Sequence, residues 1–165
     1  MIENPQEITM LKTITLTFTL FAVSVGALAG GVVYPENYRA WKHVKSMVIN
    51  EGHGLYDAVG GMHHIYGNPK ALAGYKADRF ADGSVIVFDL FEAIDKDNAV
   101  SEGARKAVIV MTKDSKKYKM NDGWGYEVFD PTNKTGKLDA KAQTECHACH
   151  MSQKDKDFVF SALRD

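Results

Sequence analysis

The 165-residue chain is poor in cysteine and proline, with two and four respectively, and neither sign of charge dominates. Its 20 Lys and Arg residues nearly balance 21 Asp and Glu residues. This balance argues against a protein that binds nucleic acid or an anionic membrane by electrostatics. Two cysteines are too few for a disulfide framework. The sequence also lacks internal repeats and low-complexity segments, which excludes solenoid and fibrous architectures.

An apolar run over residues 14–28 is too short for a comfortable membrane span, and polar sequence soon follows it. Lys12 precedes this run, which ends at Ala27-Leu28-Ala29, an A-x-A pattern typical of signal-peptide cleavage. We therefore expect residues 1–29 to be a signal peptide and the protein to be exported to the periplasm. An uncleaved membrane anchor is the alternative.

The first nine residues suit the basic start of a signal peptide poorly because they contain Glu3 and Glu7, so Met10 is a second candidate for the first residue. Without residues 1–29 the chain keeps 19 basic and 19 acidic residues. Residues 30–165 have the length of one domain with one core. We expect this mature domain to bind neither nucleic acid nor a membrane.

Both cysteines lie in one short motif, Cys146-His147-Ala148-Cys149-His150. Cys-x-x-Cys-His is the attachment signature of a c-type haem. Cysteines three positions apart share a helix face, so both thiols reach one porphyrin, and the next histidine supplies the proximal iron ligand. We expect one covalent haem c per chain, anchored by Cys146 and Cys149, with His150 as the metal ligand and no disulfide.

Two other uses of this motif are weaker alternatives. A zinc ion could be bound by His147, His150 and both cysteines, but structural zinc sites usually draw their ligands from two separated clusters. The sequence has no second cysteine cluster. A thioredoxin-like redox pair requires a βαβ context, which the sequence does not indicate.

Alternation of apolar and polar residues dominates the middle of the chain. It predicts strands over residues 84–91, 106–111 and 123–129, and one over residues 55–66 that bends at Gly60-Gly61. Helices are predicted over residues 35–50, from Asn68-Pro69 onwards, around the haem motif and over residues 158–163. These patterns predict an α+β fold, mainly antiparallel β-sheet with flanking short helices and a C-terminal haem-binding helix. A four-helix-bundle cytochrome would need long segments of 3.6-residue periodicity.

Several features follow one another in an order that points to a known family. They are Tyr34-Pro35-Glu36-Asn37-Tyr38-Arg39 with Trp41, Ile65-Tyr66 before Asn68-Pro69, Asp82-Gly83-Ser84-Val85-Ile86-Val87-Phe88, a strand containing Trp124, and the haem motif followed by Val159-Phe160. This order resembles the cytochrome P460 family of β-sheet cytochromes, and within it the cytochrome c′-beta branch. The resemblance covers essentially all of residues 30–165 and implies a c-type haem and a homodimer.

Position 88 separates two branches of the family that the chain resembles. In the hydroxylamine-oxidising branch, a lysine cross-linked to the haem follows Asp-Gly-x-Val-x-Val, and this chain has Phe88 there. Strand alternation puts Ile86, Phe88 and Leu90 on one face. The resemblance implies that this face lines the distal side of the haem and that Phe88 caps the open iron position. Ordinary core packing is the alternative for Phe88.

The resemblance also bears on the rest of the distal side. It places Val59, on the neighbouring predicted strand, where relatives carry a bulky phenylalanine, which implies a roomier pocket. His63 and His64 are adjacent in a predicted strand, so at most one of them faces the haem. A histidine or methionine as a sixth iron ligand is an alternative that the sequence leaves open.

We therefore expect an exported, five-coordinate mono-haem cytochrome that binds NO or CO in an apolar distal pocket, as a scavenger, carrier or sensor. The first alternative is a haem enzyme that oxidises hydroxylamine or NO. That chemistry needs the cross-link and a distal base, for which Glu92 and Asp89 are candidates, although Asp89 should point away from Phe88. The second alternative is a six-coordinate electron-transfer cytochrome c with a redox partner protein. Weak peroxidase activity is compatible with any open haem iron.

Overall fold

The computed structural model describes residue 1 and residues 31–164, so residues 2–29 of the predicted signal peptide lie outside the described residues. One antiparallel sheet has the order β1-β2-β3-β4-β5, in which each strand pairs with the next along the chain. The strands are β1 (Lys42–Ile49), β2 (Gly61–Gly67), β3 (Val85–Lys96), β4 (Ala99–Lys113) and β5 (Trp124–Phe129). The helices are α1 (Tyr56–Val59), α2 (Pro69–Ala77) and α3 (Ala140–His150), with 3₁₀ segments η1 (Tyr38–Ala40), η2 (Lys119–Asn121) and η3 (Met151–Lys156). The α+β prediction is confirmed.

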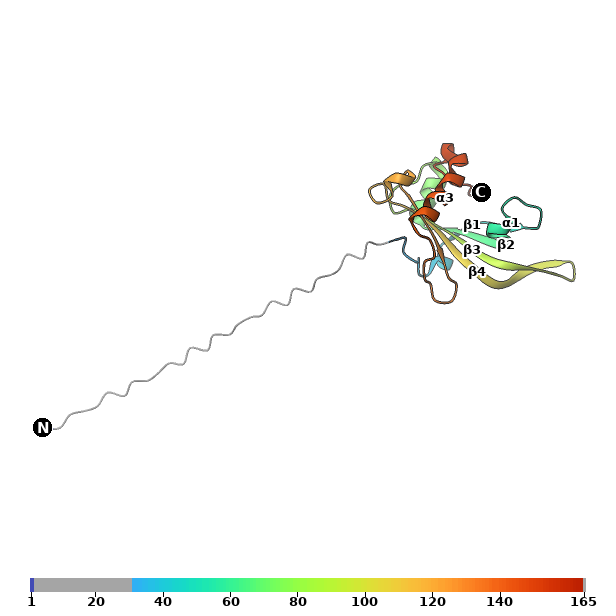
Figure 1. Ribbon diagram of the computed structural model, residues 1–165, viewed down its shortest axis with the longest axis horizontal. Helices are drawn as coiled ribbons and strands as arrows, with labels where there is room; N and C mark the ends of the chain where they lie inside the picture. The colour runs from blue at the N-terminus through green and yellow to red at the C-terminus, as the bar shows by residue number, and fades with distance from the viewer. Residues whose placement is uncertain (2–30, 165) are drawn as a thin grey trace.

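The hairpin of β3 and β4 is the longest part of the sheet and projects beyond the other strands (Figure 1). Asp97 and Asn98 form its two-residue turn, with φ angles of 55° and 60°. Left-handed backbone at both positions is the geometry of a type I′ turn, which matches the twist of paired strands. Asp and Asn tolerate this conformation better than most residues. None of the described helices is long and apolar enough to cross a membrane.

The sheet has an apolar layer on each face. The C-terminal helix α3 contacts β5 and packs on one face, which we call the α3 face. Its buried residues are Val44, Ile65, Ala71, Phe80, Ile86, Met111, Trp124, Tyr126, Phe158 and Val159. On the opposite face, Val32 and Tyr38 from the N-terminal segment pack on Val87, Val108 and Val110. Adjacent residues of β3 enter different layers, so alternate residues share a face over residues 85–90, before the register shifts that follow Leu90.

Several predicted elements are confirmed. β3, β4 and β5 contain the strands expected over residues 84–91, 106–111 and 123–129, and α2 begins at Pro69. The Asn68 side chain accepts hydrogen bonds from Ala71 N at 2.9 Å and from Val85 N at 3.1 Å. It therefore caps α2 and ties this helix to the start of β3.

The helix predicted over residues 35–50 is wrong. Only η1 is helical there, and residues 42–49 form β1, which pairs with β2. Val44, Val48 and Ile49 are β-branched and suit a strand, so pairing with β2 outweighs their helix-like spacing. A register shift between His43 and Lys45 breaks the two-residue alternation and hides the strand pattern in the sequence.

Two further predictions need correction. The strand expected over residues 55–66 divides into α1 and β2, because the chain turns at Gly60 before the sheet begins. Gly61 has a φ of 126° and lies against the Phe91 carbonyl, where a side chain would collide. Residues 158–163 do not form the predicted helix. Instead η3 ends at Lys156, and Phe158 and Val159 pack into the α3 face as irregular chain.

Candidate functional site

The haem motif occupies the last turns of α3. Asp139 caps the start of this helix, since its Oδ1 accepts a hydrogen bond from Ala142 N at 2.8 Å. Helical spacing places Cys146 on the same side of α3 as Cys149 and His150, which follow it by three and four positions. Cys146 is half-buried against the α3 face, and Cys149 is exposed. Burial raises the pKa of the Cys146 thiol, which is therefore protonated near neutral pH.

His150 is held in one orientation by the chain that follows α3. Its Nδ1 donates a hydrogen bond to the carbonyl oxygen of Phe158 at 2.7 Å. Burial lowers the pKa of His150, so the ring is neutral and its Nε2 carries the lone pair. The Phe160 ring, which is 48% exposed, lies edge-on to His150 with 4.9 Å between the centroids. A neutral imidazole whose Nδ1–H binds a carbonyl is ready to ligate a metal through Nε2.

The carbonyl that orients His150 belongs to a backbone in an uncommon conformation. Asp157 and Phe158 have φ angles of 49° and 67°, in the left-handed region. The buried Asp157 carboxylate accepts a hydrogen bond from Phe80 N at 2.8 Å and pairs with Lys113 Nζ at 2.8 Å. The Asp157 carbonyl accepts a hydrogen bond from Trp124 Nε1 at 2.9 Å. These three contacts hold the reversal that brings the Phe158 carbonyl to His150.

The sequence alone does not reveal this supporting group, because its members come from four separate segments. The available signal was local: Lys113 and Trp124 lie opposite each other in β4 and β5 and so share the α3 face. A second signal was Asp157, a charged residue directly before the apolar run Phe158-Val159-Phe160, where a buried carboxylate would need partners.

His147, within the motif, has a structural role. Its Nδ1 lies 3.0 Å from the Tyr126 hydroxyl and its Nε2 lies 2.9 Å from Asp122 Oδ2, so both ring nitrogens are engaged. In residues 31–164 the structure forms no group of three or more Cys, His, Asp or Glu side chains suited to a metal ion. The geometry therefore gives the zinc alternative no support.

Phe88 lies on the α3 face, as strand alternation predicts. Ile86, on the same face of β3, is part of the buried cluster, and Phe88 packs against that cluster together with Cys146. Leu90 is buried, with 3% exposure, one position further along this face. Phe88 itself is only half-buried. The structure thus brings Phe88, Ile86 and Cys146 to one apolar layer, while the role of Phe88 as an iron cap stays a prediction.

A residue with a polar ring accompanies Phe88 on this face. The register of β2 and β3 sets His63 opposite Leu90 and Ile65 opposite Phe88, and partners in an antiparallel pair point to the same side. The rings of His63 and Phe88 stack, with centroids 4.0 Å apart and planes 18° from parallel. His64 points to the other face, where its Nε2 lies 2.7 Å from Glu102 Oε1. Of the two histidines, His63 is the one on the α3 face.

The comparison with known protein families decides the identity of this fold and motif. The model of the family Cytochrome P460 matches residues 35–161, which span the sheet, α3 and the segment that binds His150. The chain belongs to the cytochrome P460 family. No curated protein matches the chain at a significant level. Membership of the cytochrome P460 family makes the protein a haem-binding cytochrome, as the motif predicts.

The residues at the site fit the haem of a cytochrome P460 protein. Two thiols lie at the attachment spacing on one helix, and the adjacent imidazole has Nδ1 engaged and its lone pair on Nε2. The layer facing this side of α3 contains Phe88 and Ile86, which offer apolar surface to a porphyrin.

The two carboxylates considered as a distal base, Asp89 and Glu92, lie in different surroundings. Asp89 is fully buried on the opposite face, where its oxygens lie 2.8 Å from Arg105 Nε and 3.4 Å from Arg39 Nε. The prediction that Asp89 points away from Phe88 is confirmed. Glu92 is exposed, and its Oε2 accepts a hydrogen bond from Ala104 N at 3.4 Å.

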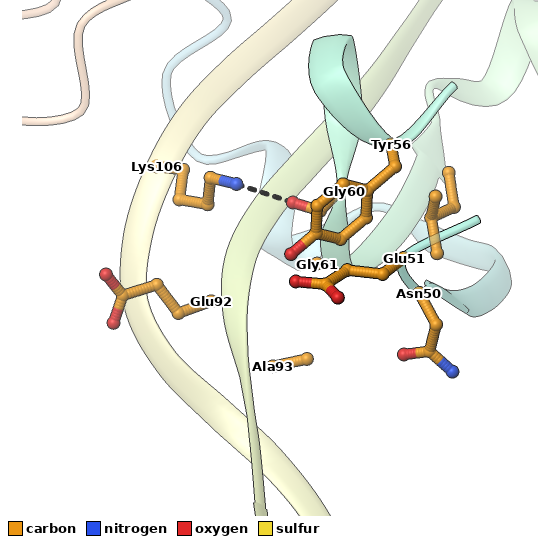
Figure 2. A pocket seen from close by; sticks show the side chains of 9 residues that line it. Asn50, Glu51, Tyr56, Gly60, Gly61, Glu92, Ala93 and Lys106 are labelled. Carbon is orange, nitrogen blue, oxygen red and sulfur yellow. Dashed lines mark hydrogen bonds between the residues drawn. The ribbon is translucent and has the colours of Figure 1, made fainter. Parts of the chain in front are cut away.

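Val59 is not on a strand. It is the last residue of α1 and is half-buried, so the prediction that it lies on a strand beside Phe88 is wrong. The cause is Gly60-Gly61, which ends a helical turn rather than bending a strand. Next to it is a cleft of about 470 Å³ lined by Tyr56, Gly60, Glu92 and Lys106, among others (Figure 2). Lys106 Nζ donates to the Gly60 carbonyl at 2.5 Å across this cleft. No residue of the haem motif lines it.

Proposed function

We propose that this cytochrome P460 protein is an exported, five-coordinate, mono-haem c-type cytochrome of the cytochrome c′-beta type that binds NO or CO. The observation that carries the proposal is the hydrogen bond from His150 Nδ1 to the Phe158 carbonyl, next to two cysteines at the attachment spacing. It presents Nε2 as a proximal ligand and leaves the other side of the haem to the side chains of the α3 face.

The chain has a distinct task for each group. Cys146 and Cys149 anchor the porphyrin through thioether bonds, and His150 supplies one axial nitrogen. Asp157, Lys113 and Trp124 hold the carbonyl that orients His150. Phe88 limits access to the remaining axial position by its bulk. A haem iron with one free axial position supplies reversible binding of a diatomic gas.

Oxidation of hydroxylamine is the weaker alternative. Phe88 has no amine for a porphyrin cross-link, and the buried Asp89 is paired with two arginines on the other face of the sheet. Of the two candidate bases this leaves Glu92, which is exposed and accepts a hydrogen bond from Ala104 N. We therefore propose gas scavenging, carriage or sensing rather than enzymatic turnover.

A six-coordinate electron carrier is the second candidate, and one observation favours it. His63 is a buried imidazole on the α3 face, where a sixth ligand would come from. Its ring is stacked on Phe88, and a move of the imidazole onto an iron would break this stacking. The stacking supports five-coordination at rest.

We propose a periplasmic location, on the basis of the A-x-A pattern at Ala27-Leu28-Ala29, and a homodimer. Ile94 and Val100, each 45% exposed near the tip of the β3–β4 hairpin, support a contact between protein chains at this hairpin. A redox partner protein is an additional proposal that follows from the haem.

The optical spectrum of the ferrous protein tests the proposed function. A five-coordinate high-spin haem gives broad bands that change strongly when NO or CO is added. A low-spin ferrous spectrum that barely responds to either gas would support the electron carrier instead.

A further inference from the structure

His63 is the most deeply buried histidine on the α3 face, and one of its ring nitrogens has no partner in the described part of the chain. Its exposed fraction is 2%, and its Nδ1 has no hydrogen-bond partner in the described part of the chain. A buried polar atom without a partner destabilises a folded protein. Native structures keep few such groups, and those that remain are often explained by a bound molecule or a functional role.

Its surroundings contrast with those of its sequence neighbour. His64 has both ring nitrogens close to polar partners, with Nδ1 2.6 Å from Ser46 Oγ and Nε2 2.7 Å from Glu102. His63 instead stacks on Phe88 and pairs across the sheet with Leu90 and Met47. The two histidines are adjacent in β2 but point to opposite faces of the sheet, so His64 serves as a control for His63.

The protonation state of His63 determines which hydrogen bonds its ring can form. Burial, together with the nearby charges of His64 and Lys45, lowers the pKa of His63 to about 4. The ring is therefore neutral near neutral pH, with one N–H donor and one acceptor nitrogen. A neutral donor suits a hydrogen bond to a bound ligand without adding a fixed positive charge to the pocket.

We propose that His63 donates a hydrogen bond to small anionic or oxygen-bearing ligands at the iron and so sets the ligand preference of the pocket. This inference rests on the proposed function, because it requires an open axial position on the α3 face. Phe88, stacked on the imidazole, restricts rotation of the ring. The pocket then combines an apolar cap with one polar side chain, instead of being wholly apolar as the sequence predicts.

Fluoride binding to the ferric protein tests the proposal, with CO binding to the ferrous protein as a reference. Fluoride accepts hydrogen bonds, whereas bound CO depends on them little. In His63→Phe, which keeps an aromatic ring next to Phe88, the fluoride dissociation constant should rise about tenfold, and CO affinity should change much less. His63→Gln, which keeps an N–H donor, should recover part of the fluoride affinity.

Two further variants complete the design. His64→Gln changes the adjacent histidine on the opposite face and should bind fluoride as the wild type does. His63→Leu provides a second apolar replacement if the larger phenylalanine prevents folding, which haem content and circular dichroism report. The carbon–oxygen stretching band of bound CO gives an independent readout, because it moves to higher frequency when a nearby N–H donor is removed.

The possible results separate this inference from the function on which it rests. Wild-type binding of CO with equal fluoride affinities in wild type, His63→Phe and His63→Leu would overturn the role of His63 and leave the proposed function intact. A low-spin wild type that binds neither ligand would overturn the proposed function. If that low-spin haem became high-spin in His63→Leu, His63 would be an iron ligand, and its role as a donor would also be overturned.

Discussion

The Phe158 carbonyl oxygen lies 2.7 Å from His150 Nδ1, across a chain reversal of eight residues. This bond selects the tautomer in which Nε2 is free to ligate iron, and it makes the imidazole a stronger donor. The reversal depends on Asp157, whose carboxylate binds the Phe80 backbone and Lys113. The orientation of His150, the proposed proximal ligand, is therefore set by residues outside the haem motif.

Asp157→Asn should loosen this arrangement. The amide oxygen retains the hydrogen bond from Phe80 N, but the ion pair with Lys113 is lost, so the unfolding free energy should fall by about 1–3 kcal/mol. A less well-held His150 is a weaker donor, so the haem reduction potential should rise and the iron–histidine stretching frequency should fall. Denaturant unfolding, potentiometry and resonance Raman spectroscopy measure these effects.

Asp155→Asn is the matched control, because Asp155 is an exposed aspartate two positions earlier. It should leave both stability and reduction potential unchanged. Equal potentials in the two variants would mean that Asp157 supports the fold without influencing the iron.

Phe88→Ala should speed the association of CO and NO with the ferrous protein. In the proposed pocket Phe88 hinders an incoming ligand by its volume, so its removal should lower a steric barrier. Loss of the ring should also cost about 2–3 kcal/mol of stability, below the range for a fully buried phenylalanine because Phe88 is half-buried. Stopped-flow or flash-photolysis kinetics give the association rates. An unchanged rate would show that Phe88 contributes to packing and does not limit ligand access.

Val59→Phe tests the alignment that places a bulky residue at this position in relatives. If the end of α1 borders the distal pocket, the larger side chain should slow CO and NO association. Because Val59 is at the end of α1 and not on a strand beside Phe88, an effect on the rates would show that α1 borders the pocket. Rates equal to those of the wild type would show that Val59 lies outside the pocket.

Acidification should destabilise the protein through His63. Its pKa is about 4 in the folded protein and about 6.5 in the unfolded chain, so between these values only the unfolded chain binds the proton. The stabilisation is complete above about pH 6.5 and is lost progressively towards about pH 4, to a total of about 3 kcal/mol. His63→Phe lacks this dependence, so its stability should fall less between about pH 6.5 and about pH 4 in denaturant titrations. Parallel losses in both proteins would assign the acid sensitivity to other groups, such as His43, whose pKa burial also lowers.

The parts of this molecule that depend on short stretches of sequence were predictable. The haem motif needs only five consecutive residues, and β3 needs only the alternation that follows Asp82-Gly83. Asn68-Pro69 indicates the start of α2 because the cap and the first helical residue are adjacent.

The parts that depend on distant partners were not predictable. β1 has helix-like spacing and becomes a strand through its pairing with β2, with a register shift that conceals the alternation. The hydrogen bond between Phe158 and His150 requires a left-handed turn that contacts with Phe80, Lys113 and Trp124 stabilise. The sequence showed that at most one of His63 and His64 shares a face with Phe88, and the pairing of β2 with β3 was needed to tell which.

The mass of the mature chain after acid–acetone treatment tests the central claim most directly, namely that Cys146, Cys149 and His150 hold a haem. The account predicts that the red colour stays with the protein and that its mass exceeds that of the polypeptide by one haem. It also predicts that Cys146→Ser with Cys149→Ser yields a chain without this added mass. A colourless polypeptide with extracted haem in the solvent would contradict covalent attachment and with it the proposed c-type cytochrome.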